Sequence, residues 1–183
     1  MNTFLIRMMV SSCLLASISC AASELVPSNI EPVDLTKLEG LWFDVAHFEH
    51  PVGDYCDTMT MLNFRRDESD AALSFSVRCK KNGHSRRLEG DYYLSEMHPD
   101  QIAMVFDIEE LNDEFDTDYY ILASSEEPGW VALGYPSRGT LWIWSHTSSL
   151  PAGSLLAIRE TLSEAGHFSF QELDGLVVVG EVR

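Results

Sequence analysis

Basic residues are scarce in this sequence. Twelve Lys and Arg residues stand against 29 Asp and Glu residues, which gives the 183-residue chain a formal charge of −17. Phosphate backbones and anionic lipid surfaces repel so acidic a protein, so we expect no nucleic acid partner. After residue 22 the chain also lacks an uninterrupted apolar run of about 18 residues, the length that a membrane-spanning helix needs. We therefore expect membrane contact only through a lipid anchor.

Disorder and collagen-like repeats are excluded by composition, because 45% of the residues are hydrophobic and 22% are charged. No internal repeat is present. Residues 23–33 contain two prolines and no apolar period, which predicts a tether. We expect one folded domain over residues 34–175, followed by a tail at 176–183.

The N-terminal residues 1–22 resemble an export signal. Arg7 is their only charge, an apolar stretch runs from Met8 to Ile18, and small residues follow up to Ala22. A secreted protein cleaved near Ala22 is one interpretation. The other is a lipoprotein cleaved before Cys20, since residues 16–20 loosely resemble a bacterial processing site. An acylated Cys20 would then anchor the protein in the periplasm or at the outer membrane.

Cysteine is rare, and two of the four cysteines fall inside the expected signal. Cys56 and Cys79 remain, in a compartment where disulfides persist, so one intramolecular bridge is the simplest assignment.

Short runs rich in β-branched and aromatic residues recur about every ten residues, with turn residues between them. Eight such runs indicate an antiparallel meander closed into a barrel. They are 41–48, 58–64, 73–79, 88–94, 102–108, 119–124, 130–135 and 140–145.

The second and third runs can be paired by assuming a tight turn near Asp67. Leu62 then lies opposite Leu73, and Cys56 lies opposite Cys79, within the Cα distance that a disulfide allows. The opposite faces of both runs are polar. The face of Leu62, Phe75 and Val77 is therefore predicted to point inward.

The apolar period changes after residue 150. Pro151 at a first helical position, a stripe of Leu155, Ile158 and Leu162, and Gly166 as a C-terminal cap predict a helix over about 151–164. A last strand is expected at 168–173.

Two segments of the chain resemble signatures of the lipocalin family. Residues 33–46, with Gly40 and Trp42, resemble its first motif, and residues 141–147 with the helix after them resemble the bacterial lipocalin and apolipoprotein D subgroup. Residues 120–123 and 130–133 resemble that subgroup's sixth and seventh strands. The resemblance implies an all-β fold, an eight-stranded antiparallel up-and-down β-barrel with one C-terminal α-helix on its side. His146 stands where the family has an arginine packed across the conserved Trp, so a weaker cation–π contact is expected there.

Strand parity, extended through this resemblance, places nine apolar or aromatic side chains inside the barrel. Such a wall suits a fatty acid, a lysophospholipid or a related lipid. They are Leu62, Leu73, Phe75, Val77, Tyr92, Ile102, Met104, Phe106 and Trp142. The expected function is binding and transport or storage of that ligand. The alternatives are a filled barrel that acts as a protein-interaction module, and an enzyme acting on a bound lipid.

Basic residues gather beside the expected mouth of the barrel, where they either meet an acidic head group or balance neighbouring acids. They are Arg78, Lys80, Lys81, Arg86 and Arg87. The acidic segment 107–118 lacks the glycine of an EF-hand loop, and no Cys/His spacing matches a zinc site. Both cysteines outside the signal are expected to be oxidised. We therefore predict no metal, no cofactor and no catalytic residue.

Overall fold

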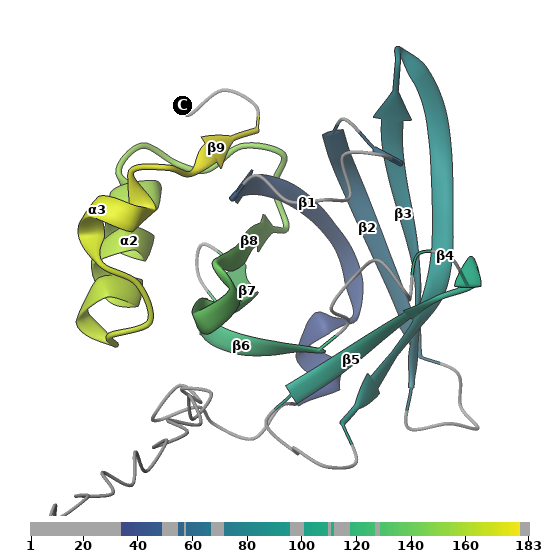
Figure 1. Cartoon of the computed structure of the whole chain (residues 1–183), viewed down its shortest axis with the longest axis horizontal. Coiled ribbons are helices and arrows are strands. Elements are labelled where there is room, and N and C mark those ends of the chain that lie inside the picture. Colours follow the sequence, from purple (N-terminus) through teal and green to yellow (C-terminus); the bar gives the residue numbers. More distant parts are fainter. Residues whose placement is uncertain are drawn as a thin grey trace, which may run out of the picture.

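The strands of this protein curl into a ring, and two helices pack against one side of it (Figure 1). The computed structural model describes residues 34–48, 55–56, 58–66, 72–95, 101–109, 111, 118–126 and 129–179. The expected signal, Cys20 and the tether lie outside these residues. The strands are β1 (Gly40–His47), β2 (Thr58–Arg66), β3 (Leu73–Lys81), β4 (His84–Leu94), β5 (Gln101–Phe106), β6 (Asp118–Ser125), β7 (Trp130–Tyr135), β8 (Thr140–Ser145) and β9 (Val177–Val178). The helices are η1 (Leu35–Leu38), η3 (Pro136–Arg138), α2 (Ser154–Glu164) and α3 (Phe170–Leu173).

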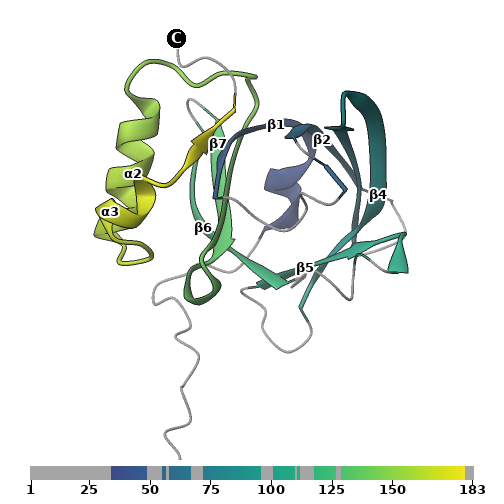
Figure 2. The ribbon, with the colours of Figure 1, turned by 45° about the horizontal axis from the view of Figure 1, so that its top comes forward.

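The sheet is an antiparallel meander. Its order is β2-β3-β4-β5-β6-β7-β8-β1-β9, and pairing between β1 and β2 closes the ring. In Figure 2 the short helix η1, in purple, lies across the ring. The predicted eight-stranded up-and-down barrel with a helix on its side is confirmed.

Two apolar clusters fill the molecule, one on each face of the sheet. The inner cluster consists of Leu38, Trp42, Cys56, Leu62, Phe64, Leu73, Phe75, Val77, Cys79, Leu88, Tyr92, Ile102, Met104, Phe106, Leu111, Tyr119, Val131, Leu133, Trp142 and Trp144. The outer cluster consists of Val45, Ala46, Tyr120, Leu122, Trp130, Ala132, Tyr135, Leu141, Ile143, Leu150, Ile158, Leu162, Phe168 and Leu173. Helix α2 contributes Ile158 and Leu162, both 0% exposed, to the outer cluster.

The predicted register of the β2–β3 hairpin is wrong. Leu62 lies opposite Val77, four residues along β3 from the expected Leu73. The connection between Arg66 and Leu73 is longer than the assumed tight turn, and this moves the pairing. A shift of four residues preserves strand parity, so the inward face is unchanged. Cys56 precedes β2 instead of pairing with Cys79, which lies opposite Met59.

The C-terminal region differs from its prediction in three places. Helix α2 begins at Ser154, so Pro151 is not its first residue, although Gly166 follows the helix with φ +76° as predicted. The expected strand at 168–173 is wrong, because it contains helix α3. A capping box explains this: Ser169 accepts a hydrogen bond from the Glu172 amide, and the Glu172 carboxylate accepts one from the Ser169 amide. In the expected tail, β9 pairs with β1.

Among the described residues, none of the helices combines the length and the apolar content that a membrane crossing requires.

Candidate functional site

The nine side chains predicted to line the barrel are all buried, and all belong to the inner cluster. Their exposed fractions range from 0% for Ile102 to 8% for Met104. The strand register brings these side chains next to one another. Tyr92 of β4, for example, lies opposite Leu73 of β3 on one side and opposite Met104 of β5 on the other. Strand parity, extended through the family resemblance, therefore agrees with the inner cluster of the structure.

A cavity of about 20 Å³ lies inside the barrel. It is bordered by Leu62, Val77, Tyr92, Met104, Phe106, Tyr119, Leu133, Trp142 and Trp144. The predicted Leu73, Phe75 and Ile102 do not border it. Tyr119, Leu133 and Trp144 were missed, although Trp144 follows Trp142 by two residues and so shares its face. This volume holds about one water molecule, so a lipid has to displace side chains.

Aromatic rings occupy the rest of the interior. Phe64 and Phe75 each meet Tyr92 edge-on, at ring-centroid distances of 5.2 and 5.0 Å, and Phe75 meets Phe106 at 5.4 Å. Burial, with a smaller contribution from Tyr119, raises the pKa of Tyr92 well above its usual value. The Tyr92 phenol therefore stays protonated and the middle of the barrel stays apolar.

A buried acid lies on the inner face of β1. The Asp44 side chain is 0% exposed, and its Oδ2 lies 2.7 Å from Nδ1 of His47. Burial raises the pKa of Asp44, against the opposing effect of the hydrogen bond with His47. A β-bulge between Asp44 and Ala46 turns these residues, three apart in sequence, to one face. The sequence pattern does not indicate this pair, because strict alternation puts the two residues on opposite faces.

The closed end of the barrel is built around Trp42. Its indole Nε1 donates to the Leu38 carbonyl at 2.8 Å, and His146 lies over its ring with centroids 3.7 Å apart. His146 Nδ1 lies 2.9 Å from the Leu41 carbonyl oxygen. The histidine therefore occupies the place that the family resemblance implies for an arginine.

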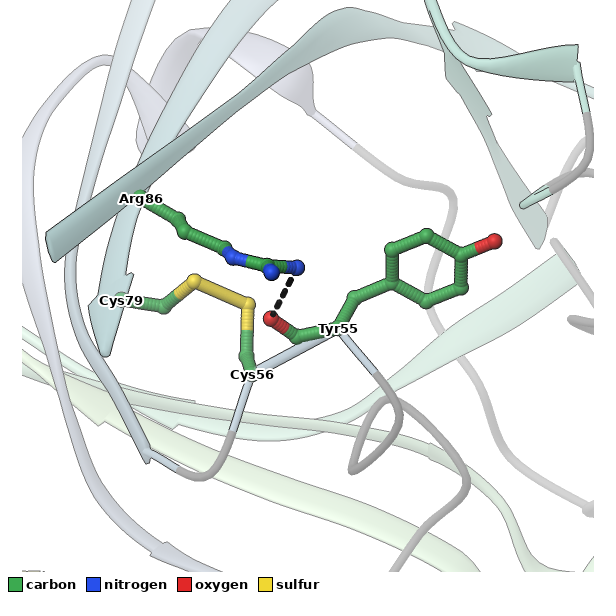
Figure 3. Close-up of a disulfide and its surroundings, with 4 residues drawn as sticks. All are labelled: Tyr55, Cys56, Cys79 and Arg86. Atoms are coloured by element: carbon green, nitrogen blue, oxygen red, sulfur yellow. Dashed lines mark hydrogen bonds between the residues drawn. A yellow bond between two sulfur atoms is a disulfide. The ribbon is translucent and has the colours of Figure 1, made fainter. Parts of the chain in front are cut away.

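A disulfide ties the segment before β2 to β3 (Figure 3). Cys56 and Cys79 have Cα atoms 5.6 Å apart, so the predicted bridge is confirmed despite the wrong hairpin register. Arg86, opposite Cys79 on β4, donates from Nη1 to the Tyr55 carbonyl at 3.5 Å. Arg86 therefore shares a sheet face with Cys79 of the inner cluster, at the end of the barrel opposite Trp42.

The other basic residues expected at the mouth are distributed over different faces. Arg87 lies on the outer face and forms an ion pair with Glu89 at 2.6 Å. That pair borders a polar groove of about 380 Å³ outside the barrel. For Arg87 the structure favours the simpler alternative, a basic side chain that balances a neighbouring acid. Residue 110 and residues 112–117 of the acidic segment lie outside the described residues, and within the described part no cluster of His, Cys, Asp or Glu has the composition of a metal site.

Comparison with known proteins places this barrel among similar folds. A family model described as a lipocalin-like domain matches residues 33–174. No curated protein matches the chain.

Several solved structures share the fold at low sequence identity. Insecticyanin from the tobacco hornworm Manduca sexta has a TM-score of 0.58 at 14% identity, with 84% of each chain covered. Lobster apocrustacyanin A1 has a TM-score of 0.56 at 14% identity, covering 80% of this chain and 79% of its own. The cockroach allergen Per a 4 has a TM-score of 0.58 at 14% identity, covering 84% and 92%.

Proposed function

The chain belongs to the lipocalin-like family, and on this premise we propose that it binds a small hydrophobic ligand inside its barrel and transports or stores it. Members of the family are generally binding or transport proteins rather than enzymes. We place the chain in the subgroup of bacterial lipocalins and apolipoprotein D. The strongest support for this placement is the Trp-rich eighth strand followed by the helix.

The observation that carries the binding function is the inner cluster itself. Apolar and aromatic side chains from β2 to β8 converge on one interior, and an apolar molecule buried there gains roughly 25 cal/mol for each Å² removed from water. Uptake requires the rings of Phe75, Tyr92 and Phe106 to separate, since the present cavity is about 20 Å³. Met104 borders that cavity, and its flexible side chain adapts readily to a new neighbour.

The finer ligand class that we propose is a fatty acid, a lysophospholipid or a related lipid. Arg86 supports it, because this guanidinium lies on the sheet face of Cys79 at the end of the barrel opposite Trp42, where a head group would rest.

Native mass spectrometry with organic extraction, on the protein purified from its own source, tests the proposal. We expect a stoichiometric lipid adduct. An empty protein that also takes up none of a panel of fluorescent fatty acids and lysolipids would overturn the binding function.

A pair of substitutions on one strand locates the ligand. Met104→Trp adds bulk inside the barrel and should abolish uptake. Val105→Trp adds the same side chain on the outer face, where Val105 is 41% exposed, and should leave uptake intact. Circular dichroism of both variants checks the fold. Equal uptake by the two would place the ligand outside the barrel.

The small cavity also favours a second candidate, a filled barrel that serves as a protein-interaction module. This candidate predicts no adduct, no uptake and a protein partner that co-purifies stoichiometrically.

The disulfide and the family are typical of exported proteins. We propose that residues 1–22 direct export and that Cys20 is the alternative lipid attachment site. Mass spectrometry of the mature N-terminus separates cleavage near Ala22 from acylation at Cys20.

A further inference from the structure

Two polar atoms inside the barrel have no hydrogen-bond partner among the described residues. They are Oδ1 of Asp44 and Nε1 of Trp144. Asp44 is 2% exposed and Trp144 is 3% exposed, so bulk water does not reach them. Buried polar groups are almost always hydrogen-bonded, so a pair left without partners calls for an occupant that supplies them.

The two residues stand at the same level of the barrel. Asp44 of β1 lies directly opposite Trp144 of β8 in the antiparallel register, and opposed side chains share one face with Cβ atoms about 4.5–5.5 Å apart. Trp144 belongs to the inner cluster and borders the cavity, so both side chains point inward.

The chemistry of the two atoms is complementary. The indole N–H only donates, whereas a carboxylate oxygen only accepts. One group that accepts and donates at once satisfies both atoms, and a hydroxyl is the smallest such group an organic ligand can carry. The other Asp44 oxygen is already engaged by His47.

We propose that Asp44 and Trp144 form a receptor for a neutral hydroxyl on the part of the ligand that enters the barrel. The hydroxyl accepts from Nε1 of Trp144 and donates to Oδ1 of Asp44. A ligand carboxylate at this depth has no proton to donate and is repelled by the Asp44 carboxylate. The subsite therefore selects an alcohol among otherwise equal apolar molecules. This inference rests on the proposed binding function.

Two probes of equal chain length test the selection: 1-tetradecanol and its methyl ether. Binding is followed by titration calorimetry on the full mature protein. We expect the alcohol to bind about tenfold more tightly than the ether, because the ether leaves Asp44 Oδ1 without a donor.

Two substitutions separate the two hydrogen bonds. Trp144→Phe removes the N–H and keeps an aromatic ring, so the alcohol and the ether should both weaken, by about tenfold, and their ratio should persist. Asp44→Leu removes the acceptor, so the alcohol and the ether should bind equally. Loss of a buried carboxylate whose Oδ1 is unpaired is compatible with folding, which thermal unfolding of the variant checks.

Tyr120→Phe is the matched control. The Tyr120 hydroxyl is also buried and has no partner among the described residues, but it belongs to the outer cluster. This variant should keep the affinities and the alcohol preference of the original protein.

The outcomes distinguish the two proposals. If the wild-type protein binds the probes but binds alcohol and ether equally, the hydroxyl subsite is refuted, while the binding function stands. If no probe and no lipid of the fluorescent panel binds, the binding function itself falls and this inference with it.

Discussion

The inner and outer clusters differ in what they surround. The outer cluster packs α2 onto the sheet through aliphatic side chains such as Ile158 and Leu162, both 0% exposed. The inner cluster surrounds the cavity, a set of interlocked rings and the buried Asp44–His47 pair. We infer from this division that the outer cluster stabilises the fold, whereas the inner cluster has the features that suit a ligand. Four predictions test this division, from the largest expected effect to the smallest.

Leu162→Ala should destabilise the protein by about 2–5 kcal/mol, because it removes a fully buried side chain of α2. Ligand uptake at low temperature should be unchanged. Leu156→Ala on the same helix is the control, since Leu156 is 50% exposed and its loss should be nearly neutral. Urea unfolding measures both. An equal cost for the two variants would show that α2 does not hold the fold through its buried face.

Replacement of Cys56 and Cys79 by serine should lower the free energy of unfolding by about 2–4 kcal/mol, since the bridge closes a loop with a sequence separation of 23. Urea unfolding of the double variant, beside the wild-type protein with and without reductant, provides the measurement. A reductant effect on the double variant would show that the destabilisation has another source.

Asp44→Asn should raise the free energy of unfolding above that of the wild-type protein by about 1–3 kcal/mol at neutral pH, and by less at acid pH. Burial raises the pKa of Asp44 in the folded state above its unfolded value. As the pH falls, the folded carboxyl therefore binds its proton at a higher pH than the unfolded carboxyl does. The stability that this proton contributes is present in full below about pH 4 and is lost as the pH rises through the raised pKa.

His47 faces Asp44 from the same strand, and Tyr92 and Tyr119 belong to the same inner cluster from β4 and β6. Burial raises the pKa of Tyr92 well above its usual value and so further from this pH range. Urea unfolding of both proteins from pH 3 to pH 8 measures the difference. A difference that is constant across this range would refute a raised pKa.

His146→Arg should stabilise the closed end by about 0.5–1 kcal/mol, since a guanidinium over Trp42 makes a stronger cation–π contact than an imidazole. Thermal unfolding of His146→Arg and His146→Ala, beside the wild-type protein, should give the wild type a melting temperature between those of the two variants. A melting temperature for His146→Arg below the original would show that the hydrogen bond to Leu41 matters more than the ring contact.

The fold was largely predictable from the sequence. Short runs of β-branched and aromatic residues, separated by turn residues, located all eight barrel strands, because strands of a meander have that composition and spacing. The predicted secondary structure was wrong where a second local pattern favoured a different structure. A last strand was expected at 168–173, but the Ser169–Glu172 capping box stabilises a helical turn there instead.

The candidate site was predictable in part. Parity placed Leu62, Val77, Tyr92, Met104, Phe106 and Trp142 beside the cavity, but it overlooked Trp144 and the Asp44–His47 pair. Trp144 was within reach of parity, since it follows Trp142 by two residues on β8. The Asp44–His47 pair was not, because the bulge in β1 inserts one residue and reverses the parity after it. No residue type in residues 44–47 indicates that a bulge occurs there.

The sequence by itself determined the class of fold, the inward face of the hairpin and the pairing of Cys56 with Cys79, because each follows from strand periodicity or from the small number of candidate partners. Tertiary structure alone decided the hairpin register, the size of the cavity and the position of Asp44 opposite Trp144. The hairpin register depends on the length of the connection between Arg66 and Leu73, and the other two features depend on how the strands meet across the closed barrel. Contacts between residues about 100 positions apart leave no periodic trace in a single sequence.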